Sequence, residues 1–85
     1  MTEDEAARWM LKEFEEFGFL YQEGAATHLF QYNDERLAYF DKYSNLCVGK
    51  KVLALFNSLT PKAVYERAGK FWRLRLETDQ PGRQQ

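Results

Sequence analysis

The segment at residues 48–61, VGKKVLALFNSLTP, carries the clearest helical pattern in the chain. Its apolar residues recur at intervals of four, three, one and three, which places them on one narrow face of a helix. They are Val48, Val52, Leu55, Phe56 and Leu59. Thr60-Pro61 ends the pattern, because the residue before a proline is disfavoured in helical geometry. We therefore predict a surface helix with its apolar stripe toward the core.

A β-hairpin is predicted immediately after this helix, over residues 63–77, because Ala68-Gly69 separates two β-prone runs. Alanine is poor at a turn position with positive φ, so we expect a three-residue loop, residues 67–69, with its glycine in the left-handed position. That register pairs Val64 with Trp72. Alternation along the second strand then predicts Trp72, Leu74 and Leu76 on the core side, and Phe71, Arg73 and Arg75 facing outward.

The N-terminal half predicts two further helices and some short strands. Thr2-x-x-Glu5 is a capping box, and an apolar stripe that includes Phe17 follows it until Gly18, a suitable C-terminal cap. A second, shorter helix is expected from Gln22 to Tyr32. Short strands are expected at residues 19–21 and 37–40, and residues 46–48 are placed to pair back on the latter.

The composition bounds the size and the compartment of the protein. Eighty-five residues with 45% hydrophobic and 16% aromatic content suit one folded domain, predicted at residues 1–77, with a disordered polar tail at residues 78–85. The single cysteine, Cys47, suits a reducing cytoplasm. No apolar run approaches the roughly 18–20 residues that span a bilayer. We expect a soluble cytoplasmic protein that does not enter a membrane.

The order of elements resembles that of a winged helix. The predicted class is α+β, with three helices, a C-terminal β-hairpin, and a short extra strand or hairpin between the second and third helices. In that fold the third helix often enters the major groove of DNA while the hairpin forms the wing. The departure here is the segment from Leu37 to Val48, which is longer than the turn of a plain helix-turn-helix.

Several short motifs also carry a family resemblance. They are Ala7-x-Trp9-Met10-Leu11, Leu20-Tyr21-Gln22, the run from Asn45 to Leu53 with Phe56, Phe71-Trp72-Arg73-Leu74-Arg75 and Pro81-Gly82-Arg83. With these motifs the chain resembles a family of small uncharacterised bacterial proteins of unknown function, over nearly its whole length. The resemblance implies a shared fold and no assigned activity.

Charge is divided unevenly along the chain. Residues 1–41 hold ten acidic and three basic side chains, a net charge of −7, whereas residues 42–85 hold nine basic and three acidic ones, a net charge of +6. Such asymmetry is typical of a nucleic-acid partner, an acidic protein partner or head-to-tail self-association. The alternative is that the two halves fold together and their charges interleave.

The first functional hypothesis is double-stranded DNA binding through the third helix and the hairpin. Lysine and arginine side chains there would contact phosphates, with Asn57 or Ser58 near a base edge and Phe71 against a base or sugar. The candidate contacts are Lys50, Lys51, Asn57, Arg67, Lys70, Phe71, Arg73 and Arg75. A sequence pI near 5.8 and the moderate density of these cations weaken this hypothesis.

The second hypothesis is a non-enzymatic protein-interaction module, either a homodimer or an adaptor for an unknown partner. Its candidate anchors are Trp9, Tyr43 and Phe71. Trp9 falls off the apolar stripe of the first helix, near Glu13 and Glu16. A large aromatic in such a place either marks an interface or is covered, in a small domain, by a loop or by the hairpin.

Enzymatic chemistry lacks candidate groups in this sequence. His28 is the only histidine and Cys47 the only thiol, so no catalytic dyad, metal site or cofactor site is predicted. We expect structural roles instead: a partly exposed His28 on a helix and a buried core thiol at Cys47. The acidic group Glu13, Glu15 and Glu16 is expected to be a solvated helix face.

Overall fold

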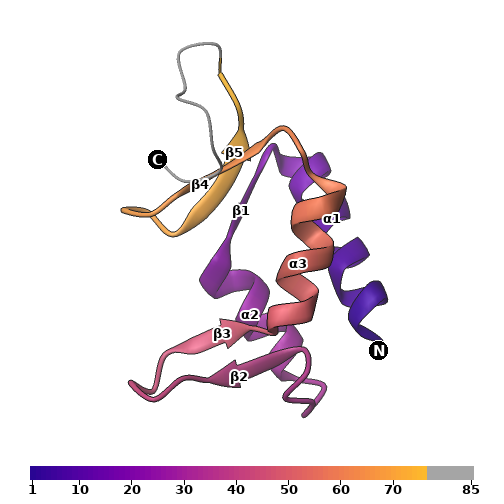
Figure 1. Cartoon of the computed structure of the whole chain (residues 1–85), viewed down its shortest axis with the longest axis vertical. Coiled ribbons are helices and arrows are strands. Elements are labelled where there is room, and N and C mark those ends of the chain that lie inside the picture. Colours follow the sequence, from indigo (N-terminus) through magenta and orange to yellow (C-terminus); the bar gives the residue numbers. More distant parts are fainter. Residues whose placement is uncertain (77–85) are drawn as a thin grey trace.

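The computed structural model describes residues 1–76, which fold as an α+β domain with a winged-helix-like order of elements (Figure 1). The elements are α1 (Glu3–Phe17), β1 (Phe19–Tyr21), α2 (Gln22–Phe30), β2 (Ala38–Phe40), β3 (Leu46–Val48), α3 (Lys50–Leu59), β4 (Ala63–Glu66) and β5 (Phe71–Leu74). The expected extra strands between α2 and α3 are β2 and β3. The tail predicted at residues 78–85 lies outside the described residues.

Helix α1 begins and ends where its sequence predicts. The Glu5 N–H donates to Thr2 Oγ1 at 3.1 Å and the Thr2 N–H donates to Glu5 Oε1 at 2.8 Å, which completes the capping box. Gly18 closes the helix at φ 78°, and its N–H donates to the Phe14 carbonyl oxygen. Because this left-handed residue turns the chain sharply, β1 can start directly after the helix.

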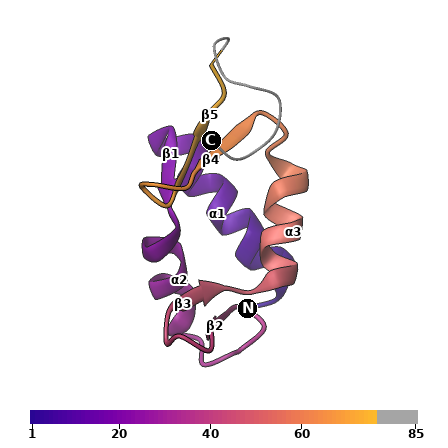
Figure 2. The ribbon, with the colours of Figure 1, turned by 60° about the vertical axis from the view of Figure 1, so that its left-hand side comes forward.

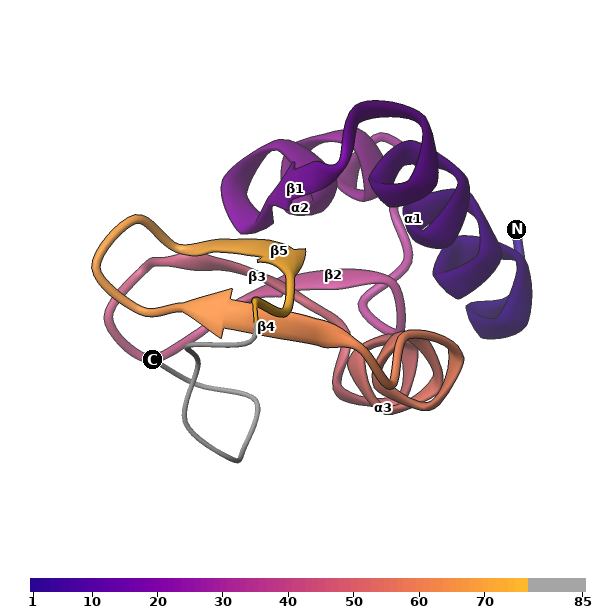
Figure 3. The same cartoon turned by 90° about the horizontal axis from the view of Figure 1, so that it is seen from above.

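Two antiparallel sheets lie toward opposite ends of the long axis, and α3 runs between them (Figure 1). The larger sheet has the order β1-β5-β4, so the central strand of the sheet is the last one in the chain. Strands β2 and β3 form the second sheet, a small hairpin. Seen from above, the β4–β5 hairpin extends away from α1 and α3, as a wing does (Figure 3).

One aromatic side chain connects the layers of the core. Phe56 of α3 meets Phe14 of α1 edge to face, with ring centroids 6.1 Å apart, and meets Trp72 of β5 at 5.1 Å. Figure 2 shows the ribbons of α1 and α3 next to each other, with β5 above them. Phe56 has no exposed surface and Trp72 only 4%. The apolar stripe predicted for the third helix is therefore confirmed at its centre, and the hairpin packs on it through Trp72.

The predicted register of the terminal hairpin is wrong by one residue. The turn has four residues, 67–70, and its left-handed position is Lys70 at φ 55° rather than Gly69. Tyr65 therefore pairs with Trp72, and Val64 pairs with Arg73. The Lys70 carbonyl oxygen accepts the Gln22 N–H at 2.9 Å, so a contact with the start of α2 holds the longer turn in place.

The predicted facing of β5 is correct at Trp72 and wrong beyond it. Leu74 is 56% exposed and Leu76 is 59% exposed, although both were expected in the core. Strand β1 is only three residues long and pairs with Phe71 to Arg73, so it ends before Leu74. The end of the hairpin thus projects past the part of β5 that pairs with β1.

Candidate functional site

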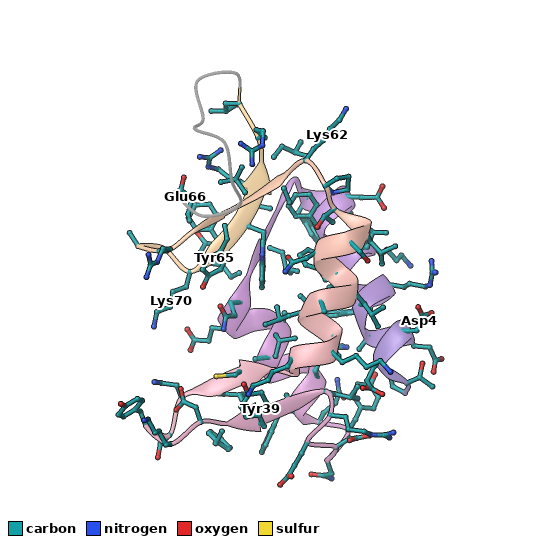
Figure 4. The ribbon with its side chains drawn as sticks, viewed as in Figure 1. Asp4, Tyr39, Lys62, Tyr65, Glu66 and Lys70 are labelled. Atoms are coloured by element: carbon teal, nitrogen blue, oxygen red, sulfur yellow. The ribbon has the colours of Figure 1, made fainter. Side chains whose placement is uncertain are left out.

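The structure divides the candidate nucleic-acid contacts into two groups. Lys50 and Lys51 lie at the N-terminal end of α3, beside β2, where they line a cleft of about 590 Å³. The hairpin that carries Arg67 and Lys70 follows the other end of α3 (Figure 1). Figure 4 shows Lys62 and Lys70 at opposite ends of the hairpin and pointing away from the body. Asn57 is exposed on the last turn of α3.

Carboxylates interrupt both groups of cations. The cleft at Lys50 and Lys51 also contains Glu3 and Glu35. On the hairpin, Arg73 donates to Glu66 Oε1 through its Nε at 2.8 Å, and its terminal nitrogen lies 2.6 Å from the same oxygen. Both side chains of this pair are only about a quarter exposed, so the ion pair neutralises much of the local charge. The described residues therefore do not form one carboxylate-free positive face.

A second, polar cleft of about 540 Å³ separates the two hairpins. The Tyr65 hydroxyl donates to Gln22 Oε1 at 2.5 Å in it, and burial raises the pKa of Tyr65. Cys47 also lines this cleft. It was expected as a buried core thiol, but the structure shows it only half-buried. Burial first, and the nearby Asp41 carboxylate second, raise the pKa of Cys47, which keeps the thiol protonated.

Asp41 shapes the turn between β2 and β3. Its Oδ1 accepts the N–H groups of Tyr43 at 2.8 Å and Asn45 at 2.9 Å, which closes the turn between β2 and β3. These hydrogen bonds, led by the one from Asn45, lower the pKa of Asp41. Tyr43 stands at the tip of this turn with 73% of its surface exposed, and the Lys42 ammonium lies 5.1 Å from its ring.

Side chains from α1, β1 and α2 surround a third cleft of about 430 Å³, which we call the aromatic cleft. It is lined by Trp9, Glu13, Phe17, Phe19, Leu20, Tyr21, Gly24 and His28. The lining residues follow the spacing of the element that carries them, four residues apart on a helix and two apart on a strand. Residues 9, 13 and 17 form one row along α1, residues 24 and 28 form another along α2, and residues 19 and 21 share one face of β1.

Trp9 belongs to this cleft and is also partly covered. Its ring stacks on the His28 imidazole, with centroids 3.9 Å apart and planes at 5°. Helix α2 is therefore the part of the domain that covers Trp9, and His28 is partly exposed as expected. The tryptophan is half-buried and lines the cleft, and its cover comes from α2 rather than from a loop or the hairpin. That Trp9 marks an interface stays a prediction.

The sequence did not reveal the other rings of the cleft. Phe17 was expected on the buried stripe of α1 but is 59% exposed; it is the last residue of the helix. Phe19 is 46% and Tyr21 is 51% exposed, while Leu20 between them points into the core. Their rings meet edge to face at 5.6 Å, and Tyr21 lies 5.2 Å from Phe71 of β5. The alternation of residues 19–21 around a buried leucine was the available signal.

Comparison with known proteins identifies a family but no activity. Residues 2–74 match the model of DUF6953, a family of unknown function, and the chain belongs to that family. No curated protein matches the chain significantly. No solved structure does so either. Among residues 1–76, no helix combines the length and apolar character needed to cross a membrane, and no group of three or more His, Cys, Asp or Glu side chains is placed to hold a metal ion.

Proposed function

We propose that this family member is a non-enzymatic binding module that docks a protein partner in the aromatic cleft. The observation that carries the proposal is that exposed rings of α1 and β1 line the aromatic cleft together. They are Phe17, Phe19 and Tyr21, and the half-buried Trp9 lies in the same cleft. Interfaces are enriched in large aromatic side chains, and their strongest anchors fill pockets.

The exposed aromatic side chains of the cleft favour binding of a partner, because water contacts their apolar surface in the isolated chain. A phenylalanine side chain contributes roughly 1.5–3 kcal/mol when it is buried from water, and Phe17 and Phe19 forgo much of that in the isolated chain. A partner that covered the cleft would recover it. The cavity, about 430 Å³, is large enough for one or two side chains of an incoming segment.

The state of the two reactive side chains, Cys47 and His28, supports the proposal of a non-enzymatic module. The thiol of Cys47 has a raised pKa and points toward the Asp41 carboxylate, with Sγ and Oδ2 3.8 Å apart, so it is a poor nucleophile. His28 is engaged with the Trp9 ring and lies on another cleft than Cys47. A reducing bacterial cytoplasm is the setting we propose, since the free thiol would persist there.

Site-specific photo-crosslinking in living cells tests the docking site. A photoreactive phenylalanine analogue at Phe17 is expected to give a defined protein adduct, whereas the same analogue at Ala54, exposed on α3, gives none. Gly24→Met should abolish the Phe17 adduct, because open space surrounds the position of a Cβ there and a long side chain would fill the cleft.

Thr27→Met is the matched control, since Thr27 is exposed on the same helix but outside the aromatic cleft. It should leave the Phe17 adduct intact. An adduct that survives Gly24→Met, or the absence of any adduct at Phe17, would contradict the proposal. Circular dichroism of each variant confirms that α1, α2 and α3 remain folded.

A second candidate function is double-stranded DNA binding by the hairpin, which one specific observation favours. Residues 62–77 carry five basic side chains against Glu66 and Glu77, a net charge of +3, and Arg67 and Lys70 are exposed at the tip of the hairpin. Such binding should weaken steeply with salt, and Arg67→Gln with Lys70→Gln should lower the logarithmic salt slope by about two. A gel shift at low ionic strength that shows no retardation on any duplex would remove this candidate.

A further inference from the structure

Glu13 gives the aromatic cleft a charge preference. Among the described residues that line the cleft it is the acidic one, and none of them is a lysine or an arginine. Glu13 is half-buried and lines the cleft, so its charge lies beside the aromatic rings. The hollow therefore combines several aromatic faces with one negative charge.

The surroundings add to the negative potential. Helix α1 holds six acidic residues against Arg8 and Lys12, a net charge of −4. Its last turn contains no basic residue, so nothing there compensates the negative end of the helix dipole, and Glu15 and Glu16 lie in the same stretch. A phosphate backbone would be repelled from this surface, whereas a cation would be attracted to it.

Aromatic rings and a carboxylate together select one kind of side chain. The face of an aromatic ring attracts a cation, and a planar guanidinium stacks on such a face while its N–H groups reach a carboxylate. We propose that the aromatic cleft binds an arginine side chain of the partner protein, with the guanidinium against the aromatic rings that line the cleft and directed at Glu13. The inference rests on the proposed docking site and specifies its occupant.

The geometry leaves room for this arrangement. The His28 imidazole stacks on one face of the Trp9 ring. Phe17 of α1 and the outward-facing side chains of β1 form other walls of the cleft. Gly24 has no side chain and its surroundings are open, which leaves that wall unobstructed. Phe19 and Tyr21 are held by their mutual contact and by the pairing of β1 with β5, so these two walls are formed before a partner arrives.

The test uses the whole purified chain and two short peptides that differ only in charge. The probes are acetyl-Gly-Arg-Gly-Arg-Gly-amide and its counterpart in which citrulline replaces each arginine. The indole N–H resonance of Trp9 reports binding by NMR, and its assignment is secured with the Trp72→Phe variant. The arginine peptide is expected to shift this resonance saturably, and the citrulline peptide is expected to bind about three- to tenfold more weakly.

Charge-matched variants identify the carboxylate. Glu13→Gln should weaken binding of the arginine peptide about three- to tenfold, whereas Glu15→Gln, which changes the net charge equally at an exposed position outside the cleft, should change it less than about twofold. Equal affinity for both peptides, equal effects of the two variants, or no shift of Trp9 would each overturn the arginine assignment.

The outcomes also separate this inference from the proposed function. If crosslinking at Phe17 depends on Gly24 but the two peptides bind alike, docking stands and arginine recognition falls. Sedimentation tests a second copy as the occupant, since Arg67 at the hairpin tip is exposed. Self-association that Glu13→Gln and Arg67→Gln both abolish would replace the separate partner with a second copy of this chain, whereas a monomer supports a separate partner.

Discussion

Gly49 shows how a single residue without a side chain holds two segments together. Its N–H donates to the Leu37 carbonyl oxygen at 2.7 Å, and a Cβ at this position would lie 1.8 Å from the carbonyl oxygen of Arg36. Backbone atoms cannot yield as a flexible side chain does. We predict that Gly49→Ala lowers the free energy of unfolding by about 3 kcal/mol, measured by urea denaturation.

Gly24→Ala is the control for that measurement, because no atom other than its chain neighbours and the backbone of its own helix lies within 4 Å of the Cβ it would add. It lies within α2, where alanine is favoured over glycine by at most about 1 kcal/mol. The two substitutions should therefore act in opposite directions. A loss at Gly49→Ala no larger than the effect at Gly24 would contradict the close approach.

Asp34 and Arg36 provide a pH prediction at the same scale. The guanidinium of Arg36, 2.6 Å from Asp34 Oδ2, lowers the pKa of Asp34 from 3.8 to about 2. Because the pKa is lower in the folded state, this pair stabilises the fold above pH 3.8, and the contribution is lost as the pH falls toward 2.

Arg36→Gln should therefore reduce the loss of stability between those two pH values, as followed by the urea midpoint at each pH. Lys12→Gln, which removes the same charge from an exposed position on α1, should leave the profile unchanged in shape. Parallel profiles for the native protein and Arg36→Gln would argue against the pair.

At the scale of one element, the turn between β4 and β5 holds Lys70 in the left-handed region at φ 55°. A non-glycine residue loses roughly 1–2 kcal/mol there, which exceeds the extra unfolded-state entropy of glycine. We predict that Lys70→Gly is more stable than Ala68→Gly by about 1 kcal/mol. Ala68 has no positive φ, so glycine there adds only flexibility. Thermal melts of the two variants give the comparison, and equal stability would contradict the four-residue turn.

At the scale of the whole molecule, Phe56 joins α1, α3 and β5 in one core. We predict that Phe56→Ala removes about 3–5 kcal/mol of the free energy of unfolding, a large part of the roughly 5–15 kcal/mol available to a small domain. Fluorescence and circular dichroism should still report one coincident transition, because both layers depend on the same ring.

Phe40→Ala is the matched substitution, since Phe40 is 56% exposed and contacts Phe30 at the surface. Its cost should stay below about 1 kcal/mol. If hairpin and helices unfold separately in the Phe56 variant, the single-core description is wrong.

The candidate site could be predicted only in part. Trp9 was recognisable because it interrupts the periodicity of α1, a property of neighbouring residues alone. The rings that accompany it depend on where α1 stops and on how β1 is oriented over the core, so Phe17 was assigned to the wrong environment. The sequence also grouped the lysines of α3 with the basic residues of the hairpin as one surface. The length of α3 separates these two groups, although they are alike in charge.

The amino-acid sequence by itself determined the elements of this protein, from the capping box at Thr2 and Glu5 to the apolar stripe of residues 52–56, because these depend on contacts within a few residues along the chain. Only the tertiary structure decided the register of the terminal hairpin and the exposure of Leu74 and Leu76. A hydrogen bond from Gln22 to the Lys70 carbonyl and the short length of β1 determine them. Such contacts join residues some fifty positions apart, and no local pattern encodes their geometry.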